Sequence, residues 1–292
     1  MSTVRALSPQ TKGTRRRRKV EPVKIFSFIT LVVTTFLMLL PLFFMVSTSL
    51  KSKREMLKFP PTFLPENWQW SNYTEIFDTL QFGTLYKNSL IIAGLSVVGT
   101  LISSALVAYG FARFRGRGNK IWFILLLSTM MLPYPAIMIP QFVLFSQMNW
   151  IDTFLPLIVP AFFGSAYNIF LLRQFFSTLP EELFDAGRID GCGEIRMWAT
   201  IALPLSKPAL ATVAIFAFIY NWNDLLTPVL YLSSSEKFTL PVGMASLTSS
   251  RFRIPPWHLL MVASVLAMVP IVTLFAVAQK QFVEGIVLTG IK

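Results

Sequence analysis

The chain has 292 residues, of which 54% are apolar and only 14% are charged, and its formal net charge is +12 at pH 7. An ordinary soluble domain carries about 25% charged residues, so this composition excludes that class. The single cysteine, Cys192, excludes an internal disulfide and a cysteine metal cluster. The single histidine, His258, leaves almost no basis for a histidine metal site or a catalytic triad, and we predict that it packs at the membrane interface.

Six long apolar runs predict six transmembrane helices and an all-α integral membrane protein. A spanning helix needs about 20 apolar residues, and continuous rather than alternating apolar runs exclude a transmembrane β-barrel. Five of the runs contain no charged residue, and the sixth contains Asp224 as its single acid. In chain order, the predicted spans are residues 25–46, 88–112, 121–140, 153–172, 209–232 and 259–278.

The distribution of basic residues predicts the orientation of these spans. With both termini inside (N-in/C-in), the cytoplasmic segments hold 18 Lys and Arg and the outer segments hold 8, as the positive-inside rule requires. We therefore predict a basic cytoplasmic tail over residues 1–24, a six-helix domain over 25–278 and a cytoplasmic tail over 279–292. The arginine-rich run at 15–19 could indicate nucleic-acid binding, but beside a span it is better explained by contact with anionic membrane lipid.

Prolines cluster in the third and fourth predicted spans. A proline inside a helix removes one backbone hydrogen bond and kinks the helix, and in a membrane the freed carbonyl must meet protein or water. The cluster therefore indicates either a broken, cavity-lining region or a simple adjustment of helix shape. The prolines concerned are Pro133, Pro135, Pro140, Pro156 and Pro160.

A polar cytoplasmic loop, residues 173–208, separates the fourth and fifth spans and carries an unusual number of acids for this basic chain. Thr178 and Glu181 have the spacing of a capping box, which predicts a helix with Thr178 as its N-cap. Gly191 and Gly193 end that helix.

A second short helix is predicted from Glu194 to Pro204. The first helix has an apolar stripe, so it can lie on the membrane surface or fit a groove on a soluble partner. Its small residues, Ala186, Gly187 and Gly191, favour the partner because they permit close approach of another backbone.

The same loop resembles the cytoplasmic signature of permeases from binding-protein-dependent ABC importers. That signature reads E-A-A, three residues, G, nine residues, then I-x-L-P. This chain has Asp185-Ala186-Gly187, Gly191 and Ile201-Ala202-Leu203-Pro204 at that spacing, and it departs in Asp185 for Glu and Gly187 for the second Ala. The stretches "NWNDLLTPVLYL" and "QKQFVEGIVLTGIK" resemble the six-helix subunit of maltose-type, carbohydrate-uptake systems.

The resemblance implies a transport subunit in a bacterial inner membrane rather than an enzyme. It implies as partners a second homologous permease, two cytoplasmic ABC ATPases and an extracytoplasmic sugar-binding protein. The sequence contains no G-x-x-x-x-G-K-[ST] motif, so we expect ATP and Mg on the ATPases and no cofactor on this chain. The polar loop would hold the coupling helix that docks on an ATPase.

By this resemblance, three sets of residues have functional roles. We expect ATPase coupling from Glu182, Asp185, Ala186, Gly187, Asp190, Gly191, Ile201, Leu203 and Pro204. We expect a further ATPase contact from Gln281, Gly285 and Gly290 in the C-terminal tail. We expect the substrate path to include Tyr167, Asn168, Asn221, Trp222, Asn223 and Asp224.

The substrate-path residues supply neutral hydrogen-bonding groups and aromatic faces, as sugar recognition requires. They could instead form hydrogen bonds between helices at the permease interface, and in maltose-type systems the other permease makes most sugar contacts. A peptide, polyamine or phosphate importer remains an alternative. An ion-coupled carrier is disfavoured because Asp224 is the one ionisable residue inside a predicted span.

Overall fold

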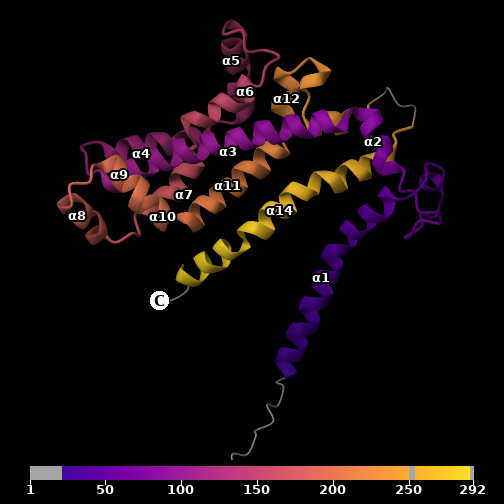
Figure 1. Ribbon diagram of the computed structural model, residues 1–292, viewed down its shortest axis with the longest axis horizontal. Helices are drawn as coiled ribbons and strands as arrows, with labels where there is room; N and C mark the ends of the chain where they lie inside the picture. Colours follow the sequence, from indigo (N-terminus) through magenta and orange to yellow (C-terminus); the bar gives the residue numbers. More distant parts are fainter. Residues whose placement is uncertain (1–21, 250–253, 290–292) are drawn as a thin grey trace, which may run out of the picture. The chain divides into compact units, whose positions relative to one another are not determined.

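The computed structural model describes the backbone of residues 22–249 and 254–289 and the side chains of 23–249 and 254–279. Every regular element in these ranges is helical, so the predicted all-α class is confirmed (Figure 1). The chain divides into two compact units, Met1–Met45 and Val46–Lys292. The arginine-rich run at 15–19 lies outside the described residues.

The first helix, α1 (Pro22–Ser49), is apolar around its whole circumference. Its large side chains, such as Phe26, Phe36 and Met38, are exposed. A helix that is hydrophobic all round belongs in a large core or in a membrane. The composition of α1 therefore fits a membrane-spanning helix.

Within the described residues, four helical segments are long and apolar enough to cross a membrane, or six if each of two bent pairs counts as one span. The four are α1, α3 (Phe82–Arg113), the segment Leu155–Phe176 and the first part of α14 (Trp257–Thr289). The third of these combines α6 (Leu155–Ile158), η3 (Val159–Phe163) and α7 (Ala166–Phe176). These segments fit the predicted membrane-spanning helical protein.

The third predicted span, residues 121–140, is broken rather than continuous. Helices α4 (Asn119–Ser128) and α5 (Tyr134–Gln147) meet at a bend of 96°. A short 3₁₀ turn, η2 (Thr129–Met131), leads into extended backbone at Leu132 and Pro133. The residue before a proline avoids the helical region, so Pro133 ends the helix instead of only kinking it.

The fifth predicted span, residues 209–232, is also interrupted. Helix α11 (Lys207–Trp222) stops at Trp222, and α12 (Leu226–Tyr231) begins only after three further residues. Pro228 lies in the first turn of α12, where its missing N–H costs nothing. At its other end, α11 meets the helical run Glu194–Leu205 at 83°.

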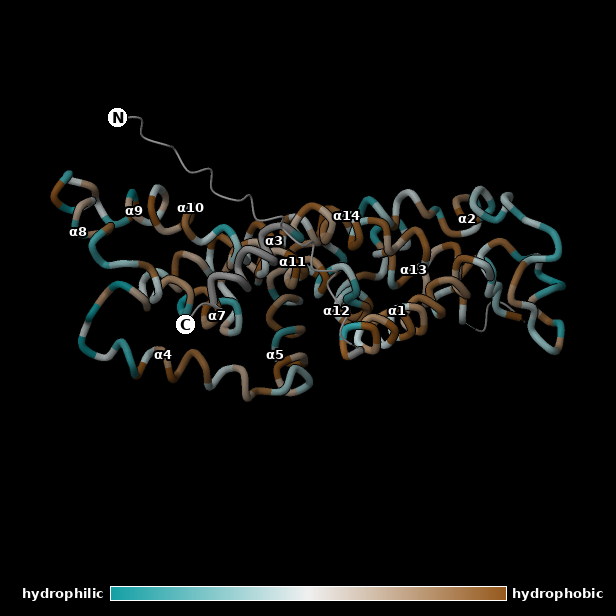
Figure 2. Tube along the Cα trace, turned by 90° about the horizontal axis from the view of Figure 1, so that it is seen from below, coloured by the Kyte–Doolittle hydropathy of each residue, from teal (hydrophilic) through white to brown (hydrophobic). Residues whose placement is uncertain are grey.

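The core of the second unit forms where α3 packs against α7 and α11, and where α11 packs against α14 (Figures 1 and 2). Helix α3 presents small buried residues such as Ala93, Ser96 and Ala108 to its neighbours. At Gly99 an added Cβ would lie 2.6 Å from Phe162 Cδ2. This close approach brings η3 against α3, just before Gly164, where η3 ends with a left-handed φ of 87°.

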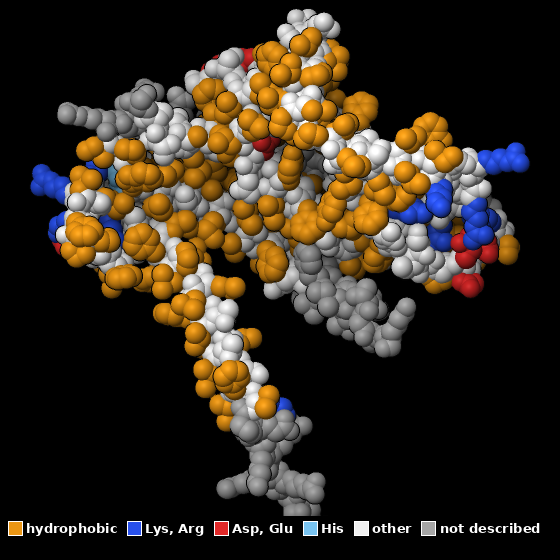
Figure 3. Space-filling model, turned by 180° about the vertical axis from the view of Figure 1, so that it is seen from behind, with side chains coloured by type: hydrophobic (Ala, Val, Ile, Leu, Met, Phe, Trp, Pro, Cys, Tyr) orange, Lys and Arg blue, Asp and Glu red, His pale blue; other side chains and the backbone are white. Residues whose placement is uncertain are grey.

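Charged side chains gather at two ends of this unit, and hydrophobic side chains cover much of the face between them (Figure 3). One end carries ion pairs such as Lys53–Glu75 and Lys58–Glu66, and the other carries Arg188 with Asp185. Such a division fits a membrane protein with polar loops outside the bilayer. The remaining short elements are η1 (Glu55–Leu57), α2 (Asn72–Leu80), α8 (Glu181–Ile189), α9 (Glu194–Met197), η4 (Trp198–Ala202), α10 (Leu203–Leu205), η5 (Ser235–Lys237) and α13 (Leu240–Ser246).

Candidate functional site

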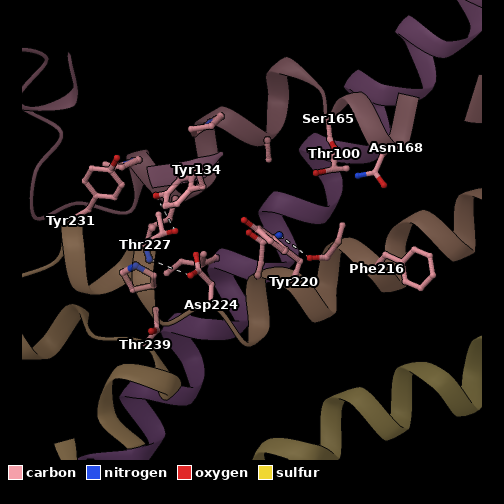
Figure 4. A pocket seen from close by; sticks show the side chains of 18 of the residues that line it. Thr100, Tyr134, Ser165, Asn168, Phe216, Tyr220, Asp224, Thr227, Tyr231 and Thr239 are labelled. Atoms are coloured by element: carbon pink, nitrogen blue, oxygen red, sulfur yellow. Dashed lines mark hydrogen bonds between the residues drawn. The ribbon is translucent and has the colours of Figure 1, made fainter. Parts of the chain in front are cut away.

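A cavity of about 750 Å³ lies among α3, α5, η3, α7, α11 and α12. Its volume is in the range of small-molecule sites, roughly 300–1,000 Å³. Both helix breaks contribute to its wall: Tyr134 follows the break at Pro133, and Asp224 lies in the break after α11 (Figure 4). Pro156 and Pro160 also line it, which favours the cavity-lining explanation of the proline cluster.

Four of the six predicted substrate-path residues line this cavity. They are Tyr167, Asn168, Asn221 and Asp224. Tyr167 is half-exposed and Asn168 is buried. The amide Nδ2 of Asn221 donates to the carbonyl of Ala217 at 2.7 Å. The structure thus brings together residues from two helices, α7 and α11, that are far apart in the sequence.

The other two predicted residues are placed elsewhere. The Trp222 side chain is 2% exposed and packs into the core, where its Nε1 donates to Ala267 O at 3.0 Å. Its ring stacks on Phe218 and contacts Tyr86 edge-on. The prediction that Trp222 offers an aromatic face to the cavity is wrong, because consecutive helical residues point in directions about 100° apart. Asn223 is exposed, and its Nδ2 donates to Ile219 O in its own helix at 2.8 Å.

Asp224 joins the wall of the cavity to the start of α12. Its Oδ1 accepts the backbone N–H of Thr227 at 3.2 Å, and the Thr227 hydroxyl lies 3.4 Å from the Tyr134 hydroxyl (Figure 4). An aspartate in this relation to a helix satisfies one of the free N–H groups of the first turn. The intramembrane acid therefore has a structural partner in this chain.

Several polar residues of the cavity wall were not predicted from the sequence. Tyr134 and Thr227 become neighbours only because both predicted spans break, and nothing in the apolar pattern indicates the break after Trp222. Tyr220 lies in the "YNWND" stretch, yet its position on the cavity side depends on the rotation of α11. The missed polar residues are Ser89, Thr100, Tyr134, Gln141, Ser165, Tyr220, Thr227, Tyr231 and Thr239.

A set of hydrogen bonds around Asp152, called the latch below, fixes one end of the cavity wall. The Asp152 carboxylate accepts the backbone N–H groups of Ser233 and Ser234 at 3.0 and 2.9 Å, and it also accepts the Ser234 hydroxyl. Lys237 Nζ donates to the same carboxylate at 2.9 Å. The Asp152 N–H donates to Tyr231 O at 2.8 Å. The latch therefore holds the loop after α12 and positions Tyr231.

Replacing Asp152 with asparagine is expected to lower the midpoint of thermal unfolding and to weaken this positioning. The hydrogen bonds from Ser234, Ser233 and Lys237 hold the pKa of Asp152 well below its usual range. The stabilisation is therefore complete above the pKa of an unfolded aspartate, about 3.9, and is lost as the pH falls through the depressed value. Thermal unfolding of both proteins should show a constant difference from about pH 8 to about pH 5 and a smaller one below about pH 4. A difference that does not change with pH would contradict this role of the charge.

At the polar end of the unit, α8 begins differently from the prediction. Thr178 is not its N-cap: the Thr178 hydroxyl donates to Phe175 O at 2.7 Å, in the last turn of α7. Pro180 occupies the N-cap position without a side-chain hydrogen bond. Glu181 instead pairs with Arg113 Nη1 at 2.9 Å. The predicted capping box is wrong because the Glu181 side chain is taken by a base from α3.

The end of α8 agrees with the prediction from Gly191. Gly191 has a left-handed φ of 76°, and its N–H donates to Arg188 O at 3.0 Å. The N–H of Cys192 donates to Gly187 O at 2.9 Å. This pair of hydrogen bonds is a Schellman motif, which requires a left-handed residue and therefore favours glycine. The second run then extends from Glu194 to Leu205, one residue past Pro204, through a π turn at η4.

Arg113, at the end of α3, ties α8 to the helical bundle. Its side chain is 4% exposed, and its Nη2 donates to Phe176 O and Leu179 O at 2.8 and 2.9 Å. Its guanidinium also lies 3.8 Å from the centre of the buried Phe184 ring. From the sequence, Arg113 counts only as one of the basic residues that set the membrane orientation, because nothing in the local pattern distinguishes it from Arg115 and Arg117.

A second link joins α3 to the start of α9. The Tyr109 hydroxyl donates to Glu194 Oε2 at 2.9 Å, and Arg188 Nε lies 3.6 Å from Glu194 Oε1. Arg188 also pairs with Asp185 at 2.8 Å. Arg188 therefore joins α8 to α9 through Glu194, and both short helices are also joined to α3.

The predicted coupling residues divide into an exposed set and a packing set. Gly187 is buried, and Ile201 and Leu203 pack against the core that contains Phe184 and Met197. Leu183, Ile189 and Ile195 add exposed apolar side chains that the prediction did not assign to the coupling site. The exposed predicted residues are Glu182, Asp185, Ala186, Asp190, Gly191 and Pro204.

The predicted C-terminal contact lies at the end of α14. The backbone of α14 is helical through Thr289, so residues 279–289 continue the last helix instead of starting a separate loop. Gln281 and Gly285 lie on this helical extension. Gly290 lies outside the described residues.

Comparison with known proteins agrees with the resemblance found in the loop. Residues 99–287 match the family described as the binding-protein-dependent transport system inner membrane component. The sn-glycerol-3-phosphate transport system permease protein UgpE of Yersinia enterocolitica is 34% identical over 269 residues, which cover 90% of this chain and 95% of that protein. The arabinooligosaccharides transport system permease protein AraQ of Bacillus subtilis is 34% identical over 279 residues, covering 91% and 97%.

The fold is similar to that of a chain in the crystal structure of a bacterial ABC transporter involved in the import of the acidic polysaccharide alginate. The TM-score is 0.78, the sequence identity is 24%, and the match covers 94% of this chain and 100% of that chain. The family match includes α8, α9 and nearly all of the cavity wall. This chain belongs to the family of inner-membrane components of binding-protein-dependent transport systems, and it is a permease subunit rather than an enzyme.

Proposed function

We propose that this chain forms, with a second homologous permease, the path by which an ATP-driven importer moves a sugar or sugar derivative across the bacterial inner membrane. An extracytoplasmic binding protein delivers the solute, and two cytoplasmic ABC ATPases hydrolyse ATP with Mg. The observation that carries the proposal is the cavity, where neutral amides and hydroxyls stand beside tyrosine rings. These groups suit hydrogen bonding to a sugar and contact with its apolar face.

The proposed substrate path consists of the predicted residues that line this cavity. They are Tyr167, Asn168, Asn221 and Asp224. The names of the relatives support a carbohydrate or polyol derivative, since one relative transports arabino-oligosaccharides and another sn-glycerol-3-phosphate. Because of the sn-glycerol-3-phosphate permease, a polyol phosphate is the alternative solute.

We propose six spans with both termini in the cytoplasm. Counting each bent pair as one span gives six, with α11 as the part of the second pair that crosses the membrane and Glu194–Leu205 as part of the cytoplasmic loop. The 18-to-8 division of basic residues supports this orientation. In this arrangement residues 1–24 form a cytoplasmic tail, 25–278 the membrane domain and 279–292 a cytoplasmic end.

We propose that the exposed surface of α8 docks on an ATPase. Its exposed acids, Asp185 and Asp190, stand beside apolar side chains such as Leu183 and Ile189. An amphipathic helix of this kind fits a groove on a soluble partner. The contacts of Arg113 and Glu194 with neighbouring helices make α8 and α9 a stiff connection, so that motion of an ATPase is passed to α3, α7 and α11. The helical extension with Gln281 and Gly285 would reach the same partners.

Reconstitution of the complete transporter tests this function. The complex that purifies with this chain is placed in lipid vesicles, and ATP hydrolysis is measured with its binding protein loaded from a panel of neutral sugars, sugar acids and sugar phosphates. Stimulation by one loaded form is the expected result. Solute movement driven by an ion gradient, without an ATPase in the complex, would refute the proposal.

A further inference from the structure

Two of the residues that line the cavity carry buried hydroxyl groups without a hydrogen-bond partner among the described residues. Tyr231 and Thr239 both line it and are 1% and 4% exposed. Among the described residues, neither the Tyr231 hydroxyl nor the Thr239 hydroxyl has a hydrogen-bond partner. Nearly all buried polar groups in proteins are hydrogen-bonded, and an exception requires an explanation. A bound solute with hydroxyl groups of its own would supply the missing hydrogen-bond partners and so explain the exception.

Both groups are held in place by their surroundings. The Tyr231 ring stacks on Phe142 and contacts Phe145 edge-on. The Thr239 carbonyl accepts the Gly243 N–H at 3.0 Å at the start of α13. Figure 4 shows both side chains at the same end of the cavity as Asp224. Each hydroxyl can donate and accept one hydrogen bond once a solute displaces the side chains that cover it.

The charge of the cavity wall selects against anions. Of the described residues that line the cavity, Asp224 is the one with a charged side chain, and none is Lys, Arg or His. Phosphate and carboxylate groups are normally bound through Arg or Lys. An anionic solute would instead meet the Asp224 carboxylate in a medium where like charges repel more strongly than in water.

We propose that this chain's wall of the cavity takes an uncharged, polyhydroxylated sugar, with the hydroxyls of Tyr231 and Thr239 as recognition groups. The inference rests on the proposed sugar-importer function and narrows its substrate class. The two relatives are equally similar to this chain in sequence, although one is named for neutral arabino-oligosaccharides and the other for an anionic polyol phosphate. Sequence identity therefore does not choose between their solutes, and the charge of the cavity wall does. The wall of this cavity fits the neutral solute.

The charge of the transported solute gives the first test. Stimulated ATP hydrolysis is measured in the reconstituted complex with the binding protein loaded with arabinotriose, maltotriose or other neutral sugars, with sn-glycerol-3-phosphate, or with alginate trisaccharide. A neutral sugar is expected to stimulate. Stimulation by an anion alone would leave the sugar-importer function standing and overturn this inference. If no member of the panel stimulates, the proposed function fails as well.

The two hydroxyls give the second test. Tyr231→Phe and Thr239→Val remove groups that have no hydrogen-bond partner among the described residues, so the thermal unfolding midpoint should not fall. Uptake of the stimulating neutral sugar is expected to show a KM raised about tenfold in the double variant, which corresponds to losing the hydrogen bonds of two neutral groups. Tyr86→Phe, which removes a tyrosine hydroxyl outside the cavity, should leave KM unchanged. An unchanged KM in the double variant would overturn the assignment.

Discussion

Truncation of Arg113 to alanine is expected to leave the transporter assembled but to reduce binding-protein-stimulated ATP hydrolysis by up to about thirtyfold. Arg113 holds the start of α8 through Glu181, Phe176 O and Leu179 O, and it stacks on Phe184. Removing a buried donor from charged and backbone acceptors costs about 2 kcal/mol, which is roughly a thirtyfold change in a two-state population. The two states are α8 held on the bundle and α8 displaced from it, and the shift in their ratio lowers the held fraction by at most the same factor.

Two further variants separate this role from simple loss of charge. Arg115→Ala removes an equal charge two residues further along, at an exposed position after the end of α3, and should retain full stimulation. Stimulated ATP hydrolysis of Arg113→Lys should lie between the values of Arg113→Ala and Arg115→Ala, because an ammonium group has no planar fork to reach three acceptors and stack on a ring. Assembly is checked by co-purification and coupling by solute transported per ATP. Equal stimulation in Arg113→Ala and Arg115→Ala would show that α8 does not depend on Arg113.

The fold was predictable wherever a single physical requirement dominates. Runs such as 88–112 and 259–278 are long enough to cross a bilayer and carry no charge, and in lipid the backbone of such a segment must be helical. The predicted continuity of 121–140 and 209–232 failed for a different reason. Proline shows where a helix can break, but whether it kinks or stops depends on neighbours that the local sequence does not contain, such as the contact between Tyr134 and Thr227.

The site shows the same division between local and tertiary information. The end of α8 at Gly191 was predictable, because a left-handed helix terminus is a local requirement that glycine meets. The start of α8 was not, because Glu181 is bound by Arg113, which is 68 residues away in sequence. Trp222 was placed in the cavity from its residue type alone. Its real direction is set by the packing of α11 against α14, which residue type does not reveal.

At Gly187 the sequence predicts the residue type and the tertiary structure explains it. The loop signature expects a small residue there, and the structure shows which side chains lie against it. A Cβ at Gly187 would lie 3.1 Å from Met197 Sδ and 3.2 Å from Ile201 Cδ1. A single methyl group requires shifts of a few tenths of an ångström from flexible side-chain ends, and alanine gains about 1 kcal/mol of helix propensity over glycine. Gly187→Ala is therefore expected to keep both stability and stimulated ATP hydrolysis near those of the wild type.

Gly187→Leu, in contrast, is expected to separate α8 from α9 and to abolish stimulation. A larger side chain must displace Met197, which is 1% exposed, or push α8 outward. Overpacking of this kind costs about 1–3 kcal/mol. Thermal unfolding of the purified complex and its binding-protein-stimulated ATP hydrolysis measure the two effects together.

The double variant Gly187→Leu with Met197→Ala decides where the cost arises. Met197→Ala alone leaves a cavity and should destabilise by about 2–5 kcal/mol. If the introduced leucine side chain fills the space that Met197 leaves, the double variant will be more stable than the sum of the two single effects by about 1–2 kcal/mol, the coupling expected of residues in contact. Simple additivity, or a Gly187→Leu variant that behaves like Gly187→Ala, would mean that α8 does not pack on α9 in the assembled transporter. Recovery of ATP stimulation in the double variant would show that the position of α8, rather than the identity of the residue at 187, is what the ATPase requires.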